Sequence, residues 1–206
     1  MSDLHQALAQ LSVIRTQVAR DTQFRGYGPA SIAASGLLAF AVAAVQSHIT
    51  RDGRDFFPFL FVWAGTAAIA IVLTASETIG RARRVHHGLA NEMILQAAEQ
   101  FLPALVVGVL LTGVLVEAAP QQLWMLPGLW QLLFSLGVFA SCRFLPRQTL
   151  AVGIWYLVAG LTCIVVQSSA KTFSPWTMGI PFGVGQLLVA GVLQFGFEQA
   201  SEDAQQ

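Results

Sequence analysis

The sequence contains few charged residues: Lys, Arg, Asp and Glu together make up 11% of its 206 residues, less than half of the roughly 25% usual in soluble globular chains. Hydrophobic residues make up 55% and gather into six runs, which total 126 residues. Each run approaches the ~20 mainly apolar residues that a helix needs to cross a bilayer. Of the charged side chains only Glu117 falls within a run, at its end. The sequence therefore predicts an all-α membrane protein with six transmembrane helices, over 29–49, 56–76, 102–118, 123–142, 148–170 and 174–197.

Asp, Glu, Lys, Arg and His are absent from the middle of every predicted span. This absence argues against a buried proton relay or a pump for charged substrates, which use such groups. His48 lies at the opposite membrane boundary from His86 and His87, so these histidines cannot hold one haem between them. The sequence has no phosphate-binding glycine loop, catalytic Ser/His/Asp set or HExxH motif. We therefore predict no cofactor and no metal, and an intramembrane enzyme is left as a hypothesis without a nominated catalytic residue.

Cysteine and clustered basic charge are also scarce. The two cysteines, Cys142 and Cys163, fall at different predicted depths, which argues against a disulfide. The arginines are spread over short loops, so no nucleic-acid partner is predicted. The first residues show no basic segment followed by an apolar one, so we expect no cleavable signal peptide.

The loops between the runs differ in positive charge. Cytoplasmic loops carry the excess of Lys and Arg, and one side of the predicted bundle has eight of these residues against three on the other. We therefore expect both termini in the cytoplasm and a multi-pass protein of the inner (cytoplasmic) membrane. The richer side carries Arg15, Arg20, Arg25, Arg81, Arg83, Arg84, Arg143 and Arg147, and the poorer side Arg51, Arg54 and Lys171.

Three segments are predicted outside the spans. Residues 1–28 read as a cytoplasmic amphipathic helix near 3–22 followed by a turn, and 198–206 as an acidic cytoplasmic tail. A second interfacial helix is expected near 85–101. Basic residues in these segments are expected to contact anionic lipid or a partner protein. They are Arg15, Arg81, Arg83 and Arg84. These helices favour the alternative function of a membrane accessory or regulatory subunit.

The bundle itself, 29–197, carries two further patterns. The first run is rich in small residues at four-residue spacing, which allows close helix packing in lipid and predicts a homo-oligomer or a complex with another membrane protein. The fourth and sixth runs each carry tryptophan, then proline, then Gly-x-x-Gln-Leu-Leu. The hairpin 102–142 is therefore predicted to repeat as 150–197, a duplication of the kind found in transporters.

These matched motifs supply the candidate site. Gln131 and Gln186 can each donate and accept hydrogen bonds, so a shared cavity between them would suit a neutral or lipophilic ligand. The competing hypothesis is that the glutamines only bond neighbouring helices together. Our leading functional hypothesis is transport, channelling or binding of such a molecule. Gly128 and Gly183 are expected to open space beside the glutamines, Pro127 and Pro181 to free backbone carbonyls, and Trp130 and Phe182 to form aromatic walls.

Overall fold

The computed structural model describes residues 29–50, 55–85, 90–141 and 149–202. Within these ranges the chain is helical and contains no strand, and six helices are long and apolar enough to cross a membrane. The predicted fold class is confirmed to this extent, and the chain is a multi-pass membrane protein. The long helices are α2 (Pro29–Ile49), α3 (Phe56–Val85), α4 (Ala90–Ala118), α5 (Leu126–Ser141), α6 (Thr149–Ala170) and α7 (Trp176–Glu202), with a short 3-10 helix, η1 (Pro120–Met125), before α5.

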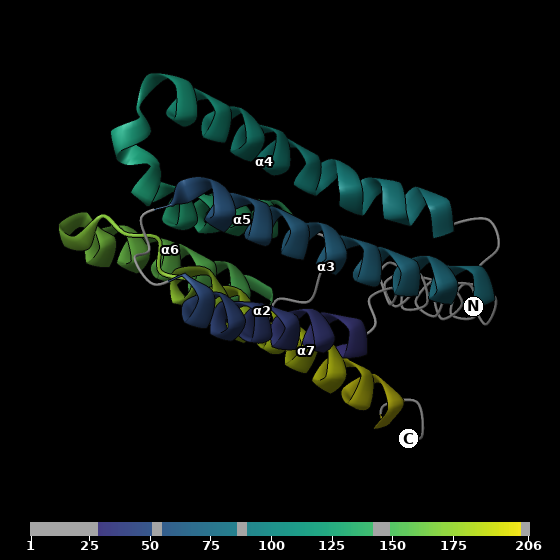
Figure 1. Ribbon diagram of the computed structural model, residues 1–206. Coiled ribbons are helices and arrows are strands. Elements are labelled where there is room, and N and C mark those ends of the chain that lie inside the picture. The colour runs from purple at the N-terminus through teal and green to yellow at the C-terminus, as the bar shows by residue number, and fades with distance from the viewer. Residues whose placement is uncertain (1–28, 51–54, 86–89, 142–148, 203–206) are drawn as a thin grey trace, which may run out of the picture.

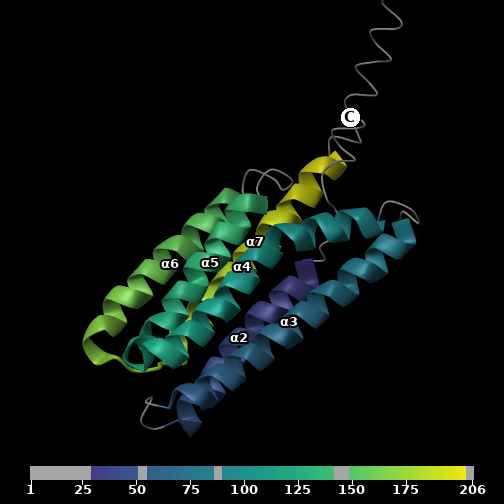
Figure 2. The same cartoon turned by 90° about the horizontal axis from the view of Figure 1, so that it is seen from above.

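The six long helices run side by side and alternate in direction (Figures 1 and 2). At one end, called here the terminal end, α2 begins and α7 ends. At the opposite end, called the tryptophan end, η1 carries Trp124 and α7 begins at Trp176. Exposed faces of the helices are apolar, with side chains such as Ile69, Val109 and Val165. These faces contact the lipid bilayer.

Three predicted boundaries differ from the structure. The second span continues without a break to Val85, so α3 includes the positions of Arg81, Arg83 and Arg84. The expected interfacial segment near 85–101 is, from Ala90 onward, part of the same helix as the third span, because Pro103 is accommodated without interrupting α4. The last helix also extends to Glu202, into the segment expected to be a tail, since Glu, Gln and Ala are good helix formers. The predicted helix at 3–22 lies outside the described residues.

Helices α2 and α7 form the most extensive helix pair in the described structure. A Cβ placed on Gly36 would lie only 2.9 Å from the carbonyl oxygen of Gly183, and Gly179 lies directly against the Ala43 side chain. Small residues let two membrane helices approach this closely. Part of the small-residue face of the first span therefore packs against α7 of the same chain.

Helices α5 and α6 form a second tight pair with similar contacts. A Cβ placed on Gly160 would lie 2.8 Å from the carbonyl oxygen of Gly128 and 3.1 Å from the Leu132 side chain. In the first pair, the corresponding neighbours of Gly36 are the Gly183 carbonyl and, at 3.5 Å, Leu187. In both pairs, the motif Gly-x-x-Gln-Leu-Leu of one helix thus packs against a glycine of its antiparallel neighbour.

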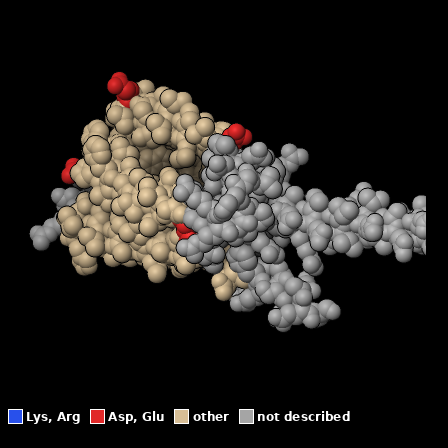
Figure 3. All heavy atoms as spheres, turned by 90° about the vertical axis from the view of Figure 1, so that its right-hand side faces the viewer, with Lys and Arg blue, Asp and Glu red and all other residues tan. Residues whose placement is uncertain are grey.

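Helices α3 and α4 are packed much more loosely. Between 67 and 77 in α3, and between 99 and 118 in α4, the structure buries no residue. Neither Gly65 nor Gly113 has a neighbour that an added Cβ would meet. Viewed from the terminal end, the described side chains surround a hollow beneath α4 (Figure 3). These two helices therefore stand partly away from the four tightly paired ones.

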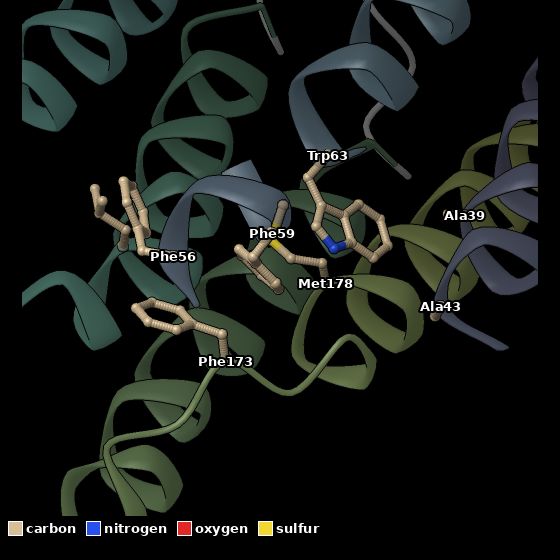
Figure 4. Packing of buried hydrophobic residues seen from close by; sticks show 8 residues of the cluster. Ala39, Ala43, Phe56, Phe59, Trp63, Phe173 and Met178 are labelled. Atoms are coloured by element: carbon tan, nitrogen blue, oxygen red, sulfur yellow. The ribbon is translucent and has the colours of Figure 1, made fainter. Parts of the chain in front are cut away.

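Helix α3 is held at the tryptophan end by an aromatic cluster. Phe56, Phe59 and Trp63 of α3 pack with Phe173 and with Met178 of α7 (Figure 4). The rings of Phe56 and Phe59 each lie 5.5 Å from that of Phe173, within the range of favourable aromatic contacts. We call these five residues the aromatic anchor.

Candidate functional site

Gln131 bonds α5 to α7. Its side chain is fully buried, and Nε2 donates a 2.7 Å hydrogen bond to the carbonyl oxygen of Thr177. Thr177 precedes Pro181 by four residues, and proline has no N–H to complete the intrahelical bond to that carbonyl. The freed carbonyl predicted from Pro181 is thus present, but its donor is the side chain of Gln131. This geometry favours the hypothesis that Gln131 fixes the bundle.

Gln186 has a different neighbourhood. Its side chain is half-buried, and its Cβ lies 3.1 Å from the position that a Cβ on Gly36 would take, so it borders α2. No described residue forms a hydrogen bond with its amide. The structure therefore directs the two glutamines toward different helices, Gln131 toward α7 and Gln186 toward α2, and no hydrogen bond joins them.

The glycines of the two motifs do not open free space. Gly128 faces the side chain of Ile164 on α6, and Gly183 faces the ring of Phe40 on α2. The expectation that each glycine leaves room beside its glutamine is wrong, because the neighbouring helix moves in to fill it. Close packing of membrane helices on small residues explains this.

The two predicted aromatic walls pack against one hydrophobic cluster. Trp130 of α5 and Phe182 of α7 are both half-buried and pack against the same cluster as the aromatic anchor. Trp130 Nε1 donates a 3.0 Å hydrogen bond to Thr112 Oγ1, which ties α5 to α4. Phe182 and Gln186 lie one turn apart on the same side of α7. Trp130, Phe182 and Gln186 are thus the predicted site residues that remain partly accessible.

Helix α6 contributes polar groups that the motif comparison did not nominate. The Cys163 thiol is buried on this helix. Gln167 Nε2 and the hydroxyl of Tyr156 are buried and have no hydrogen-bond partner among the described residues, and the same is true of Gln131 Oε1. Apart from the adjacent pair Val152 and Gly153, the buried positions of α6 recur every three or four residues, from Thr149 to Gln167. This spacing could have identified the buried face from the sequence.

Gln46 also has a defined role. Its Oε1 accepts a 2.9 Å hydrogen bond from Trp63 Nε1, which joins α2 to α3 near the tryptophan end. Beside it lies an apolar groove of about 360 Å³ between the two helices.

The basic residues predicted to contact lipid or a partner fall near or beyond the limits of the described structure. Arg81, Arg83 and Arg84 belong to the last turns of α3, and Arg15 lies outside the described residues. No group of three His, Cys, Asp or Glu side chains that could hold a metal ion occurs in the described ranges. Comparisons with protein-family models, with curated proteins and with solved structures find no match to the chain.

Proposed function

We propose that the protein binds a neutral, lipophilic molecule within the membrane and mediates its transport. The observation that carries this proposal is that Trp130 and Phe182 are half-buried against one apolar cluster, with the half-buried amide of Gln186 one turn from Phe182 on α7. Trp130 is bonded to α4, the helix that overlies the hollow seen from the terminal end (Figure 3). Ligand sites of this kind are mainly apolar, with a few polar groups that orient the ligand.

The distribution of charge supports a neutral ligand. The acidic residues of the described spans, Glu77, Glu99 and Glu117, each lie within one residue of a span end. No described Asp, Glu, Lys, Arg or His side chain lies near the middle of a span. A charged substrate would therefore lose its hydration without gaining an opposite charge.

The loose packing of α3 and α4 supports entry from the bilayer. Their apolar side chains are exposed over long stretches, and Gly65 and Gly113 have open space beside them. A molecule dissolved in the hydrocarbon layer can approach between two such helices without crossing a polar surface. We propose this lateral route for the ligand.

The binding test uses protein in bilayer nanodiscs and a neutral alkyl ketone that carries a photoreactive diazirine. We expect labelling of the intact protein, measured by mass spectrometry, to fall several-fold in Gln186→Leu, because the ketone loses its hydrogen-bond donor. The matched control is Gln194→Leu, an exposed glutamine on the same helix, which should label like the wild type. Equal labelling of all three proteins would argue against a role for Gln186.

A second candidate function is that of an accessory subunit, favoured by the helical segments outside the spans. The candidate spans end at Glu77 and begin again at Glu99, whereas α3 continues to Val85 and α4 starts at Ala90. Helix α3 thus extends by about 12 Å beyond its span and α4 by about 13 Å. Replacing Arg81, Arg83 and Arg84 by Gln should release a cytoplasmic partner from a pull-down if this function is correct.

A further inference from the structure

The groove between α2 and α3 lies on the outside of the bundle at the tryptophan end. Its volume of about 360 Å³ falls at the low end of the range for ligand pockets. Its walls include Ala41 and Val45 of α2 and Pro58 and Val62 of α3. Ala41 lies about 160° around α2 from Ala43, the residue that packs on α7. The groove therefore faces away from the tight α2–α7 contact.

The groove opens toward the hydrocarbon of the bilayer. Val45 is 59% exposed and Ile49 75% exposed, and both are apolar. None of the described residues that line the groove is charged. Its occupant must therefore be apolar along most of its length.

One polar group interrupts the apolar lining. Gln46 is only 6% exposed, and its Oε1 is already engaged by Trp63 Nε1. This bond fixes the orientation of the amide and leaves its Nε2 hydrogens available. No described residue accepts a hydrogen bond from Nε2. A buried amide in such a position is stabilised by a ligand that brings an acceptor.

We propose that the groove binds an acyl chain of a membrane lipid, with the ester carbonyl of that chain accepting a hydrogen bond from Gln46 Nε2. Gln46 lies three residues from the end of α2, or about 5 Å along the helix axis. This depth is close to the boundary between hydrocarbon and headgroups, where lipid ester groups lie. The site does not depend on the proposed function, since it involves neither Phe182 nor Gln186.

The test compares two phospholipids with the same headgroup and chain length, one with ester-linked and one with ether-linked chains. Only the ester form carries the carbonyl acceptor. Purified protein in mild detergent is incubated with each lipid, and bound lipid is counted by native mass spectrometry. We expect the wild type to retain about three times as much ester lipid as ether lipid. This ratio corresponds to the free energy of an average hydrogen bond within a membrane protein.

Two variants separate the hydrogen bond from the groove. Gln46→Leu should retain both lipids equally, whereas Ala41→Phe fills the groove and should reduce retention of both without touching the Trp63–Gln46 bond. Gln122→Leu, an exposed glutamine at the same end, is the control and should behave as the wild type. Equal retention of the two lipids by the wild type, or undiminished retention by Ala41→Phe, would overturn the proposal.

Discussion

Gln131 donates a hydrogen bond to the one carbonyl of α7 that Pro181 deprives of its helical partner, that of Thr177. A proline in one helix is thus matched by a glutamine in another. The pairing explains how α7 accommodates a proline within its length in a medium that offers no water to satisfy the free carbonyl.

This pairing predicts a thermodynamic coupling between Gln131 and Pro181. Gln131→Leu should destabilise the protein by about 1 kcal/mol, within the range measured for hydrogen bonds between membrane helices. In a Pro181→Ala background the backbone N–H restored at this position can satisfy the Thr177 carbonyl, so the same substitution should cost less. A double-mutant cycle of unfolding free energies in detergent measures the difference. Additive effects of the two substitutions would contradict the pairing.

The close glycine contacts predict opposite effects of alanine at different positions. Gly36→Ala and Gly160→Ala each place a Cβ within 3 Å of a backbone carbonyl, and should destabilise by about 1–3 kcal/mol through overpacking. Gly65→Ala and Gly113→Ala meet no neighbour and should be neutral or stabilising, since alanine favours the helix. Thermal unfolding of the four variants tests this division. If Gly160→Ala proved as stable as Gly113→Ala, the close contact between α5 and α6 would be incorrect.

A hydrogen bond to the Glu77 carboxylate is expected to contribute to the stability of the fold. Its Oε2 accepts a 3.1 Å hydrogen bond from the backbone N–H of Ser31, in the first turn of α2. A carboxylate at a helix N-terminus is typically worth about 0.3–1 kcal/mol. Glu77→Leu should therefore lower the melting temperature, whereas Glu99→Leu, at an exposed site, should leave it nearly unchanged. Identical melting temperatures for the two variants would remove the assigned role.

The predicted orientation can be tested separately from the packing. With both termini in the cytoplasm, alkaline phosphatase fused after Gln206 should be inactive, and the same enzyme inserted after Asp52 should be active. The excess of Lys and Arg on one side is the physical basis of this expectation. The opposite pattern of activity would invert the topology and place the tryptophan end in the cytoplasm.

The sequence predicts the spans well because their length and apolar content are properties of each segment alone. The ends of α3 and α7 extend beyond the predictions, since a helix can continue past the membrane boundary with residues such as Arg84 and Glu198. Hydrophobic runs mark the part of a helix inside lipid and carry little information about where the helix stops.

The candidate site was less predictable because it depends on which helices become neighbours. Gln131 and Gln186 occupy equivalent motif positions, yet one contacts α7 and the other α2. The space beside Gly128 is filled by Ile164, a residue that no local pattern around Gly128 could identify. Trp130 and Phe182, predicted as aromatic walls, both pack against one hydrophobic cluster, and their role in a ligand site stays a prediction.

The most direct test of the proposed function is a residue-level map of the photolabelled positions, made with the neutral ketone probe in nanodiscs. Binding at the proposed site predicts labels on α7 around Phe182 and on α5 around Trp130, and on the sides of α3 and α4 that face them. A carboxylate analogue of the probe should leave these positions unlabelled. Labels spread evenly over the lipid-facing surface, or equal labelling by the carboxylate, would contradict a neutral-ligand site in the bundle.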